Sequence, residues 1–252
     1  MEKLSIIILT FNEEDYIEEA ISTASFADEI IVVDSFSTDK TAEIAQNCNV
    51  IFIQNEFDNF SKQRYVAVKQ ARNNMILFLD ADERIPYLLK EEIQEVLALG
   101  KQKSAYKILF SHVFMGQVMK YGAFCKNRKL RLFNKKLCWY DETLLVHEKL
   151  IVKKGEIGGL TNPIIHQTYR SLKHTIMKKQ LYSELQAKQL YKQKIKPNFF
   201  HFIIKPMYRF VNQYFFRAGF LDGFKGFACA YINSCYVMNR YIKLWLMNNN
   251  ME

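Results

Sequence analysis

The sequence predicts an α/β protein with a mostly parallel central sheet and a C-terminal helical extension. Over the first hundred residues, short apolar runs alternate with stretches whose apolar residues recur at helical spacing. The runs are continuously apolar, as in strands that a parallel sheet buries on both faces. Beyond Pro197 the chain becomes aromatic and basic. We therefore expect a domain over 1–170, with halves 1–100 and 101–170, and an extension over 171–252.

The first half contains four expected strands, each leading into an expected helix. The strands are rich in β-branched residues and end where polar residues begin. Asn12 follows the first strand and is expected to cap the first helix, because Glu13 and Glu14 would then lie in its first turn. The expected strands are 4–10, 29–33, 50–53 and 75–79, and the helices cover 12–24, a stretch around 42–45, 61–71 and 86–99.

The second half changes character. Three strands are expected, and Gly155, Gly158 and Gly159 predict a turn after the last of them. A long helix follows, because Leu172 and Ile176 begin a series of apolar residues close to helical spacing. The expected strands are 105–114, 129–133 and 144–152, and the helix covers 171–194.

Charge divides the chain into an acidic and a basic part. Residues 1–100 contain 8 Lys and Arg against 19 Asp and Glu, and the remainder contains 27 against 7. This asymmetry indicates a cation-binding or catalytic first part and a second part that meets an anionic partner. Basic residues interleaved with aromatics suit nucleic acid bases or a membrane interface. No nucleic-acid motif is present, so an anionic membrane surface is the expected partner.

Cysteines and apolar runs indicate the compartment. The five cysteines are odd in number and form no C-x-x-C pair, which argues against a disulfide framework or a structural zinc site. The apolar run near the N-terminus is too short for a signal peptide, and the longest uncharged stretch of the tail, 226–239, is too short to span a bilayer. We expect a cytoplasmic protein, peripheral on the inner face of the cell membrane.

The stretch ILFLDADERI at 76–85 places two acids directly after a buried strand. Ligands bind outside the carboxyl ends of strands in such sheets, and Thr10, Asn12 and Asp34 also follow strands. Two carboxylates at Asp80 and Asp82 can address a divalent cation and a nearby sugar hydroxyl, because oxygen ligands suit Mg²⁺ or Mn²⁺. The cation would stabilise a leaving diphosphate.

Three segments, SIIILTFNEE, EIIVVDSFSTDKT and ILFLDADE, resemble the leading motifs of family 2 glycosyltransferases of the GT-A fold. The downstream segments RLFN, VHEKL and IIHQTYRSL resemble the branch that contains lipopolysaccharide core β-1,4-glucosyltransferases. The resemblance covers nearly the whole chain and thins after Lys196. It implies a Rossmann-like nucleotide-sugar-binding domain and an inverting transfer that depends on Mn²⁺ or Mg²⁺.

The resemblance also implies roles for individual residues. Asp34 would accept a hydrogen bond from the nucleotide base, Asp80 would face the ribose or sugar, and Asp82 would bind the metal. The chain has DSFSTD where many members have DDGSTD, so the loop after the second strand departs from the family pattern. Further contacts to the nucleotide donor are expected from Thr10, Asn12, Glu14 and Arg64.

An inverting transfer needs a base that removes the proton of the acceptor hydroxyl. The acids between Gly100 and Tyr182 are few, and Glu148 lies in the VHEKL segment, so it is the first candidate. Asp141 is the second. His166 follows an apolar pair at a place where related folds supply a further metal or diphosphate contact, so it is a candidate metal ligand.

The expected function is therefore transfer of a hexose, with glucose as the first candidate, from a UDP-linked donor to a lipid-linked saccharide such as the lipopolysaccharide inner core. A polyprenyl phosphate or protein acceptor is the alternative within the class. A non-catalytic α/β protein that binds nucleic acid is the alternative outside it, and the intact acids Asp34, Asp80 and Asp82 argue against that one. A homo-oligomer is compatible with the sequence.

Overall fold

The chain forms two compact units in the computed structural model. The first contains residues 1–110 and 126–166, and the second contains 111–125 and 167–252. The second unit therefore holds the expected extension together with a short segment of the preceding half. The described residues are 2–99, 103–124, 127–140, 150–169 and 172–251.

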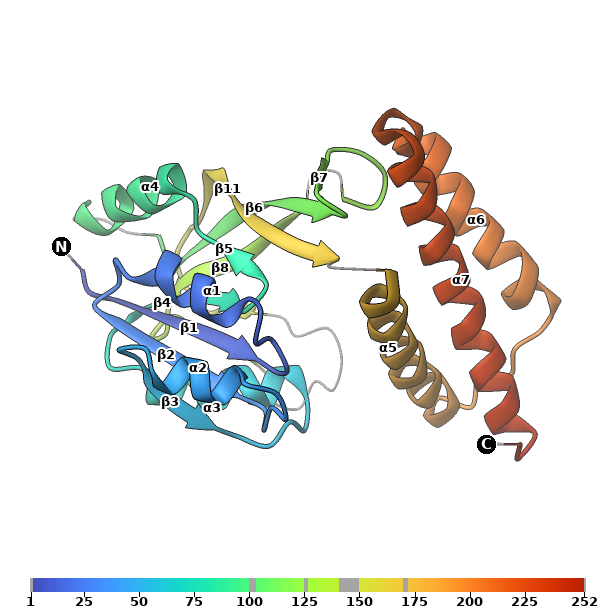
Figure 1. Cartoon of the computed structure of the whole chain (residues 1–252), viewed down its shortest axis with the longest axis horizontal. Coiled ribbons are helices and arrows are strands. Elements are labelled where there is room, and N and C mark those ends of the chain that lie inside the picture. Colours follow the sequence, from blue (N-terminus) through green and yellow to red (C-terminus); the bar gives the residue numbers. More distant parts are fainter. Residues whose placement is uncertain (1, 100–102, 125–126, 141–149, 170–171, 252) are drawn as a thin grey trace. The chain divides into compact units, whose positions relative to one another are not determined.

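The first unit is built on a sheet whose four leading strands are parallel (Figure 1). Their order is β3-β2-β1-β4, so β4 lies on the opposite side of β1 from β2 and β3. Thr10 at the end of β1 pairs with Asp34, and Leu9 pairs with Asp80. The ends of three strands therefore share one edge. The strands are β1 (Leu4–Thr10), β2 (Glu29–Asp34), β3 (Ile51–Gln54) and β4 (Met75–Asp80).

Beyond β4 the sheet continues in the order β8-β6-β11-β5. β8 runs antiparallel to both β4 and β6. The two-residue strand β5 pairs antiparallel with β11, which places Glu83 opposite His166. β7 pairs with β6, and β9 and β10 form a separate ribbon. The strands are β5 (Glu83–Arg84), β6 (Ala105–Phe114), β7 (Gln117–Met119), β8 (Arg128–Asn134), β9 (Cys138–Tyr140), β10 (Leu150–Val152) and β11 (Ile157–Tyr169).

Apolar side chains cover both faces of the parallel strands. Ile6 and Ile8 belong to one buried cluster, and Ile7 belongs to another, because successive side chains of a strand point to opposite faces. Helices α1 and α4 contribute to the first cluster, and α3 contributes Ala67 to the second. The predicted two-sided burial is confirmed. The helices are α1 (Ile17–Ala24), α2 (Thr41–Gln46), α3 (Phe60–Gln70) and α4 (Tyr87–Ala98).

The predicted cap of the first helix is wrong. α1 begins at Ile17, and Tyr16 occupies the capping position. Asn12 has a left-handed backbone with φ +54°, and its Oδ1 accepts a hydrogen bond from the N–H of Thr38 at 2.8 Å. A long-range contact has displaced the local capping preference. The amide at position 12 thus joins two loops at the sheet edge.

The long strand β11 was not predicted, and it contains two of the glycines that were expected to form a turn. Gly155 has φ +97° and does form a turn, but Gly158 and Gly159 lie inside the strand. A Cβ at Gly158 would lie 2.5 Å from the ring of Tyr106, so this glycine allows close packing. Of the expected strand 144–152, residues 150–152 form β10, and 144–149 lie outside the described residues.

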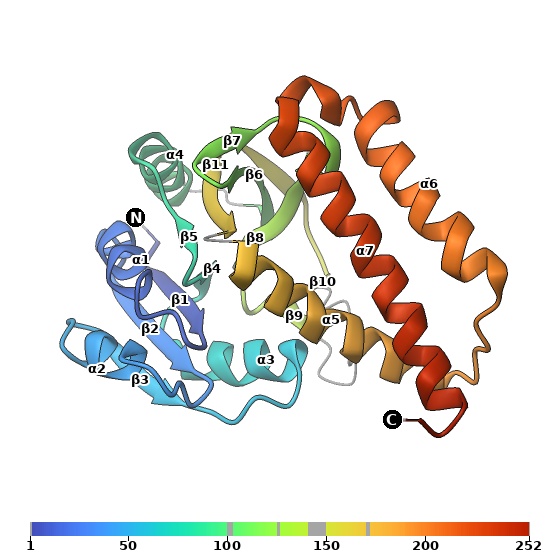
Figure 2. The ribbon, with the colours of Figure 1, turned by 45° about the vertical axis from the view of Figure 1, so that its right-hand side comes forward.

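The second unit is mainly helical from Leu172 onward (Figure 2). α7 packs along α5 and α6, which lie beside it. A Cβ at Gly226 of α7 would lie 1.9 Å from the carbonyl oxygen of Gly219, so glycine is required where these backbones meet. Within the described ranges, no helix combines the length and hydropathy needed to cross a bilayer. The helical segments are α5 (Leu172–Lys192), η2 (Phe200–Ile204), α6 (Lys205–Val211), η3 (Asn212–Phe216), η4 (Gly219–Asp222) and α7 (Gly223–Asn248).

Candidate active site

Two loops at the carboxyl edge of the sheet are cross-linked by hydrogen bonds. The N–H of Asn12 donates to Ser37 Oγ at 2.8 Å, in addition to the bond that its side chain accepts from Thr38. The N–H of Glu13 donates to Thr41 Oγ1 at 2.8 Å. The loop after β1 and the loop after β2 therefore form one rim.

Glu14 and Thr10 lie on the same rim. Glu14 Oε2 accepts from the N–H of Lys40 at 3.0 Å, and the N–H of Glu14 donates to Asp39 Oδ2 at 3.2 Å. Thr10 is buried, and its hydroxyl has no hydrogen-bond partner in the part of the chain that the structure describes. That hydroxyl is shielded from solvent in this structure.

Asp34 is fully buried at the end of β2. Its Oδ2 accepts from the N–H of Ser37 at 3.0 Å and from Gln54 Nε2 at 3.2 Å, and its Oδ1 accepts from the Ser37 hydroxyl. The carboxylate thus shapes the loop that follows β2. A base that bonds to it would have to replace one of these donors.

Asp80, Glu83 and Arg131 form a hydrogen-bonded triad below the edge. Arg131 Nη2 lies 2.8 Å from Asp80 Oδ2 and 2.7 Å from Glu83 Oε1. Glu83 Oε2 accepts from the N–H of Asp80 at 2.9 Å. Arg64 adds a contact of 3.4 Å to Asp80 Oδ1, and its guanidinium lies 4.7 Å from the centroid of the Phe78 ring. The carboxylate of Asp80 is therefore held by one arginine from β8 and one from α3.

The two carboxyl groups of the triad have different pKa values. Burial raises the pKa of Asp80, but its side chain is still 33% exposed, and the attraction of Arg131 and then Arg64 holds the pKa well below its usual range. Full burial raises the pKa of Glu83 to about 7 against the attraction of Arg131, and the charge of Asp80 raises it further. Asp80 is therefore ionised beside Arg131 at neutral pH, whereas Glu83 takes up a proton more readily.

Asp82 and His166 meet on the other side of Glu83. His166 Nε2 lies 3.2 Å from Asp82 Oδ2, because β5 and β11 are neighbours. Burial lowers the pKa of His166, but the hydrogen bond and charge of Asp82 outweigh it and raise the pKa above its usual value. Asp82 itself is buried. The pair can serve as an ion pair or as two ligands of one cation.

The spacing of this pair fits a metal ion. Two neighbouring ligands of an octahedral ion, each at about 2.1 Å, are about 3.0 Å apart, close to the observed 3.2 Å between Asp82 Oδ2 and His166 Nε2. Within the described ranges no group of three or more His, Cys, Asp or Glu side chains could hold an ion. A cation here would therefore take its remaining ligands from substrate and water.

Some expected site residues come together and others cannot be placed. Asp80, Asp82, Arg64 and His166 gather at the end of β4, whereas Asn12 and Asp34 lie with Thr10 and Glu14 on the rim formed by the loops after β1 and β2. The two candidate bases, Asp141 and Glu148, lie outside the described residues.

Sequence reasoning did not assign Glu83 or Arg131 to the site. Glu83 directly follows the acidic pair, and Arg131 interrupts the apolar strand RKLRLFN, where a charge must have a partner. These two signals could have assigned both residues to the site. Their pairing depends on β8 lying next to β4, which no local pattern indicates.

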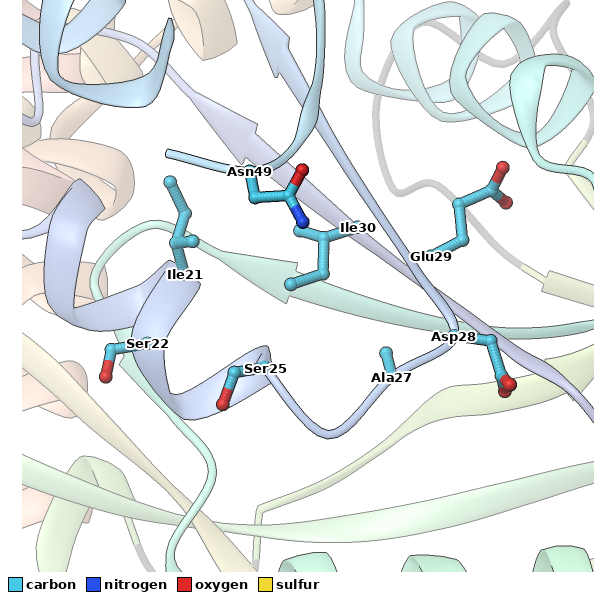
Figure 3. Close-up of a pocket in the computed structure, with 8 residues that line it drawn as sticks. All are labelled: Ile21, Ser22, Ser25, Ala27, Asp28, Glu29, Ile30 and Asn49. Atoms are coloured by element: carbon cyan, nitrogen blue, oxygen red, sulfur yellow. The ribbon is translucent and has the colours of Figure 1, made fainter. Parts of the chain in front are cut away.

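A separate hollow of about 280 Å³ lies at the opposite end of β2 (Figure 3). The hollow is bordered by Ser22 and Ser25 from the end of α1 and by Asn49 before β3. Asp28 and Glu29 are engaged there, since they accept hydrogen bonds from the N–H of Leu4 and the hydroxyl of Ser5. The amino ends of parallel strands are not where ligands of such sheets bind.

Comparison with solved structures identifies the fold. The sheet order is that of the GT-A fold expected from the sequence. Glucosyl-3-phosphoglycerate synthase from Mycobacterium tuberculosis, solved with Mn²⁺, UDP-glucose and phosphoglyceric acid, matches with a TM-score of 0.50 at 17% identity, over 72% of this chain and 78% of its own. This likeness confirms the predicted fold.

Sequence relatives identify the family. The model "Glycosyl transferase family 2" matches residues 5–136. An uncharacterized glycosyltransferase from Rickettsia typhi is 31% identical, over 97% of this chain and 86% of its own. The lipopolysaccharide core biosynthesis glycosyltransferase LpsC from Rhizobium meliloti is 28% identical, over 94% and 93%. The chain belongs to glycosyltransferase family 2, as the sequence motifs predicted.

Proposed function

We propose that this glycosyltransferase transfers a hexose from a UDP-linked donor to a lipid-linked saccharide of the lipopolysaccharide core class, with inversion at the anomeric carbon. The observation that carries the proposal is the carboxyl edge itself, where an ionised Asp80 lies beside the Asp82 and His166 pair. The relative LpsC supports the acceptor class, and the UDP-glucose in the mycobacterial structure supports the donor class.

The donor nucleotide would lie along the edge that β1, β2 and β4 share. Thr10 ends β1 beneath the proposed nucleotide, and the backbone from Asn12 to Glu14 forms the rim against which the nucleotide would rest. Asp34 would bond to the base in exchange for one of its present donors. Arg131 and then Arg64 keep Asp80 ionised, so that this carboxylate can accept hydrogen bonds from the hydroxyls of the ribose or the hexose.

The metal would be held by Asp82 and His166. A divalent cation in this position neutralises the diphosphate and stabilises it as it leaves. Carboxylate ligands suit both Mg²⁺ and Mn²⁺, but an imidazole nitrogen suits a transition metal better than Mg²⁺. The ligand pair therefore favours Mn²⁺.

The base that deprotonates the acceptor would be Glu148, with Asp141 second. Glu148→Gln keeps the shape of the side chain but cannot take a proton, so transfer should fall by about 10²- to 10⁴-fold while UDP affinity stays the same. Initial rates and calorimetry on Glu148→Gln and Asp141→Asn test this. If only Asp141→Asn loses transfer, the role belongs to Asp141.

The overall activity is tested with purified protein, Mn²⁺, a panel of UDP-hexoses and core lipopolysaccharide that lacks its outer sugars. We expect one donor to give a product whose new linkage has the configuration opposite to that of the donor, as NMR of the anomeric proton reports. Retention of configuration would contradict the inverting mechanism. Transfer to a polyprenyl phosphate but not to the saccharide would contradict the acceptor.

The second unit would bring the enzyme to the acceptor at the cytoplasmic face of the membrane. Between 199 and 224, large apolar side chains are exposed at close to helical spacing, and Arg209 and Arg217 are exposed among them. Such a surface suits the interface of an anionic bilayer, because rings enter the boundary and cations meet headgroups. This aromatic face comprises Phe199, Phe200, Ile203, Met207, Tyr208, Phe215, Phe216, Phe220, Leu221 and Phe224.

Not every cation of the tail is free for headgroups. Lys225 Nζ donates to the carbonyl of Met115 at 2.9 Å, and Lys243 Nζ donates to that of Gln180 at 3.0 Å. Arg240 donates to Gln186 Oε1 at 2.6 Å. These three contacts stabilise the helical unit. We therefore assign the proposed headgroup contacts to Arg209 and Arg217.

Membrane binding should depend on three rings of the aromatic face. Phe199, Phe216 and Phe224 are 72%, 75% and 82% exposed, so replacing all three by Ser should leave the fold intact. Burying a Phe is worth about 1.5 to 3 kcal/mol, so partitioning onto anionic vesicles should fall at least about a hundredfold. Co-sedimentation at low and high salt measures it, with binding by the parent weakening as salt rises.

A matched control lies in the first unit. Tyr87 and Leu88 of α4 are 66% and 64% exposed, and replacing both by Ser removes exposed apolar area, although less of it, from another surface. The control should bind vesicles like the parent. Equal losses of vesicle binding in both variants would show that exposed apolar side chains contribute wherever they lie. That result would contradict the membrane role of the aromatic face.

A further inference from the structure

Phe36 has a backbone conformation that phenylalanine rarely adopts. Its φ is +60°, in the left-handed region where a Cβ meets the following carbonyl oxygen and glycine meets nothing. Its ring is 53% exposed, so burial does not offset the strain. The strained backbone at Phe36 lowers stability, and the exposed ring adds little packing in return. A functional role would explain why phenylalanine occupies this position.

Hydrogen bonds on both sides of Phe36 impose this conformation. Asp34 accepts from the N–H and the hydroxyl of Ser37. Thr38 is tied to Asn12, and Asn12 donates to Ser37. The loop is therefore held independently of the residue at position 36. The backbone that carries the ring is thereby fixed at the rim.

The position of Phe36 relates it to one part of the proposed donor. It lies two residues beyond Asp34 at the end of β2, and β2 is separated from β4 by β1. Neighbouring strands are about 4.8 Å apart, so the end of β2 lies about 10 Å from the end of β4, where Asp82 would hold the diphosphate. A nucleotide that crosses β1 from that point places its ribose over β1 and its base near β2.

We propose that the ring of Phe36 stacks on the base of the donor nucleotide. This inference rests on the proposed function, because it assumes a nucleoside diphosphate with its phosphates at Asp82. Every base has an apolar face, and stacking on an aromatic side chain needs no hydrogen bond from it. The strain at Phe36 then serves to orient a binding surface before the donor arrives.

The test uses the full-length protein and calorimetric titration with UDP in the presence of Mn²⁺. Phe36→Asn suits the left-handed conformation but has no ring, and Phe36→Tyr keeps the ring. Stacking of one base is worth about a 5- to 150-fold change in affinity. We expect Phe36→Asn to weaken UDP by that factor and Phe36→Tyr to bind like the parent. The melting temperature of Phe36→Asn should equal or exceed that of the parent, because the strain is relieved.

Pyrophosphate with Mn²⁺ separates the base from the phosphates. Parent and Phe36→Asn should bind it equally, because it has no base to stack. Equal UDP affinity in the parent and Phe36→Asn would overturn the inference and leave the proposed function standing. An equal loss for pyrophosphate, or a lowered melting temperature, would assign the effect to the loop and overturn it too. A parent that binds no nucleoside diphosphate would overturn the proposed function and the inference with it.

Discussion

Asp82→Ala should reduce transfer by about a hundred- to a thousandfold and should make UDP binding indifferent to Mn²⁺. Metal assistance to a leaving diphosphate is worth several kcal/mol, and Asp82 is the carboxylate among the two proposed ligands of the ion. Asp80 is committed to Arg131 and Arg64, whereas Asp82 contacts a histidine that can bind the same cation. Calorimetry with UDP, with and without Mn²⁺, measures the binding side without an acceptor.

Two further variants sharpen this experiment. His166→Ala removes the second proposed ligand and should weaken the response to Mn²⁺ by less than Asp82→Ala does. Asp58→Asn removes a carboxylate from an exposed pair with Lys62 and should leave both affinity and rate at parental values. If Asp82→Ala keeps the parental gain from Mn²⁺, the metal assignment is wrong.

Arg131→Met should destabilise the first unit by about 3 to 5 kcal/mol, since removing one partner of a buried ion pair leaves an uncompensated charge. Glu83 is fully buried, and Arg131 is its cationic partner at 2.7 Å. Well above pH 7, where Glu83 would carry a charge, adding Glu83→Gln to Arg131→Met should restore part of the loss, because the amide carries no charge and can still accept from the N–H of Asp80. A simple packing role for Arg131 would give no such recovery.

The free energy of unfolding of the first unit can be followed by one fluorophore. The chain has two tryptophans, and Trp139 lies in the first unit while Trp245 lies in the second. Urea titrations in a Trp245→Phe background therefore report the first unit. Arg72→Met is the control, because Arg72 pairs with Glu29 from an exposed position and should cost less than about 1 kcal/mol. Comparable losses in the two variants would contradict a special role for the buried triad.

The parallel part of the fold could be predicted because its signals are local. A run such as Leu4–Thr10 is continuously apolar wherever it is read, and the acids after Met75–Asp80 follow directly in the chain. The antiparallel part could not. β5 has two residues, and β11 contains Gly158, whose role is apparent only once the ring of Tyr106 lies against it.

The site shows the same division between local and long-range information. Asp82 and His166 were each named as a candidate ligand, but their meeting depends on the pairing of β5 with β11 across 84 residues of sequence separation. Phe36 was noted only as a departure from a family motif, since strain is a property of φ and not of residue type. Single residues can be predicted from patterns, whereas their partners follow from strand order.

The triad of Asp80, Glu83 and Arg131 also constrains when the chain can fold. Glu83 and Arg131 are separated by 48 residues. A ribosome adds about 5 to 20 residues per second, so about 2 to 10 s pass between the synthesis of the acid and of its cation. During that interval β4 also lacks its neighbour β8, so the backbone groups along that edge of β4 have no strand to pair with. The nascent chain therefore spends seconds as an unfinished sheet, and this is the stage at which a chaperone bound to the ribosome would protect it most.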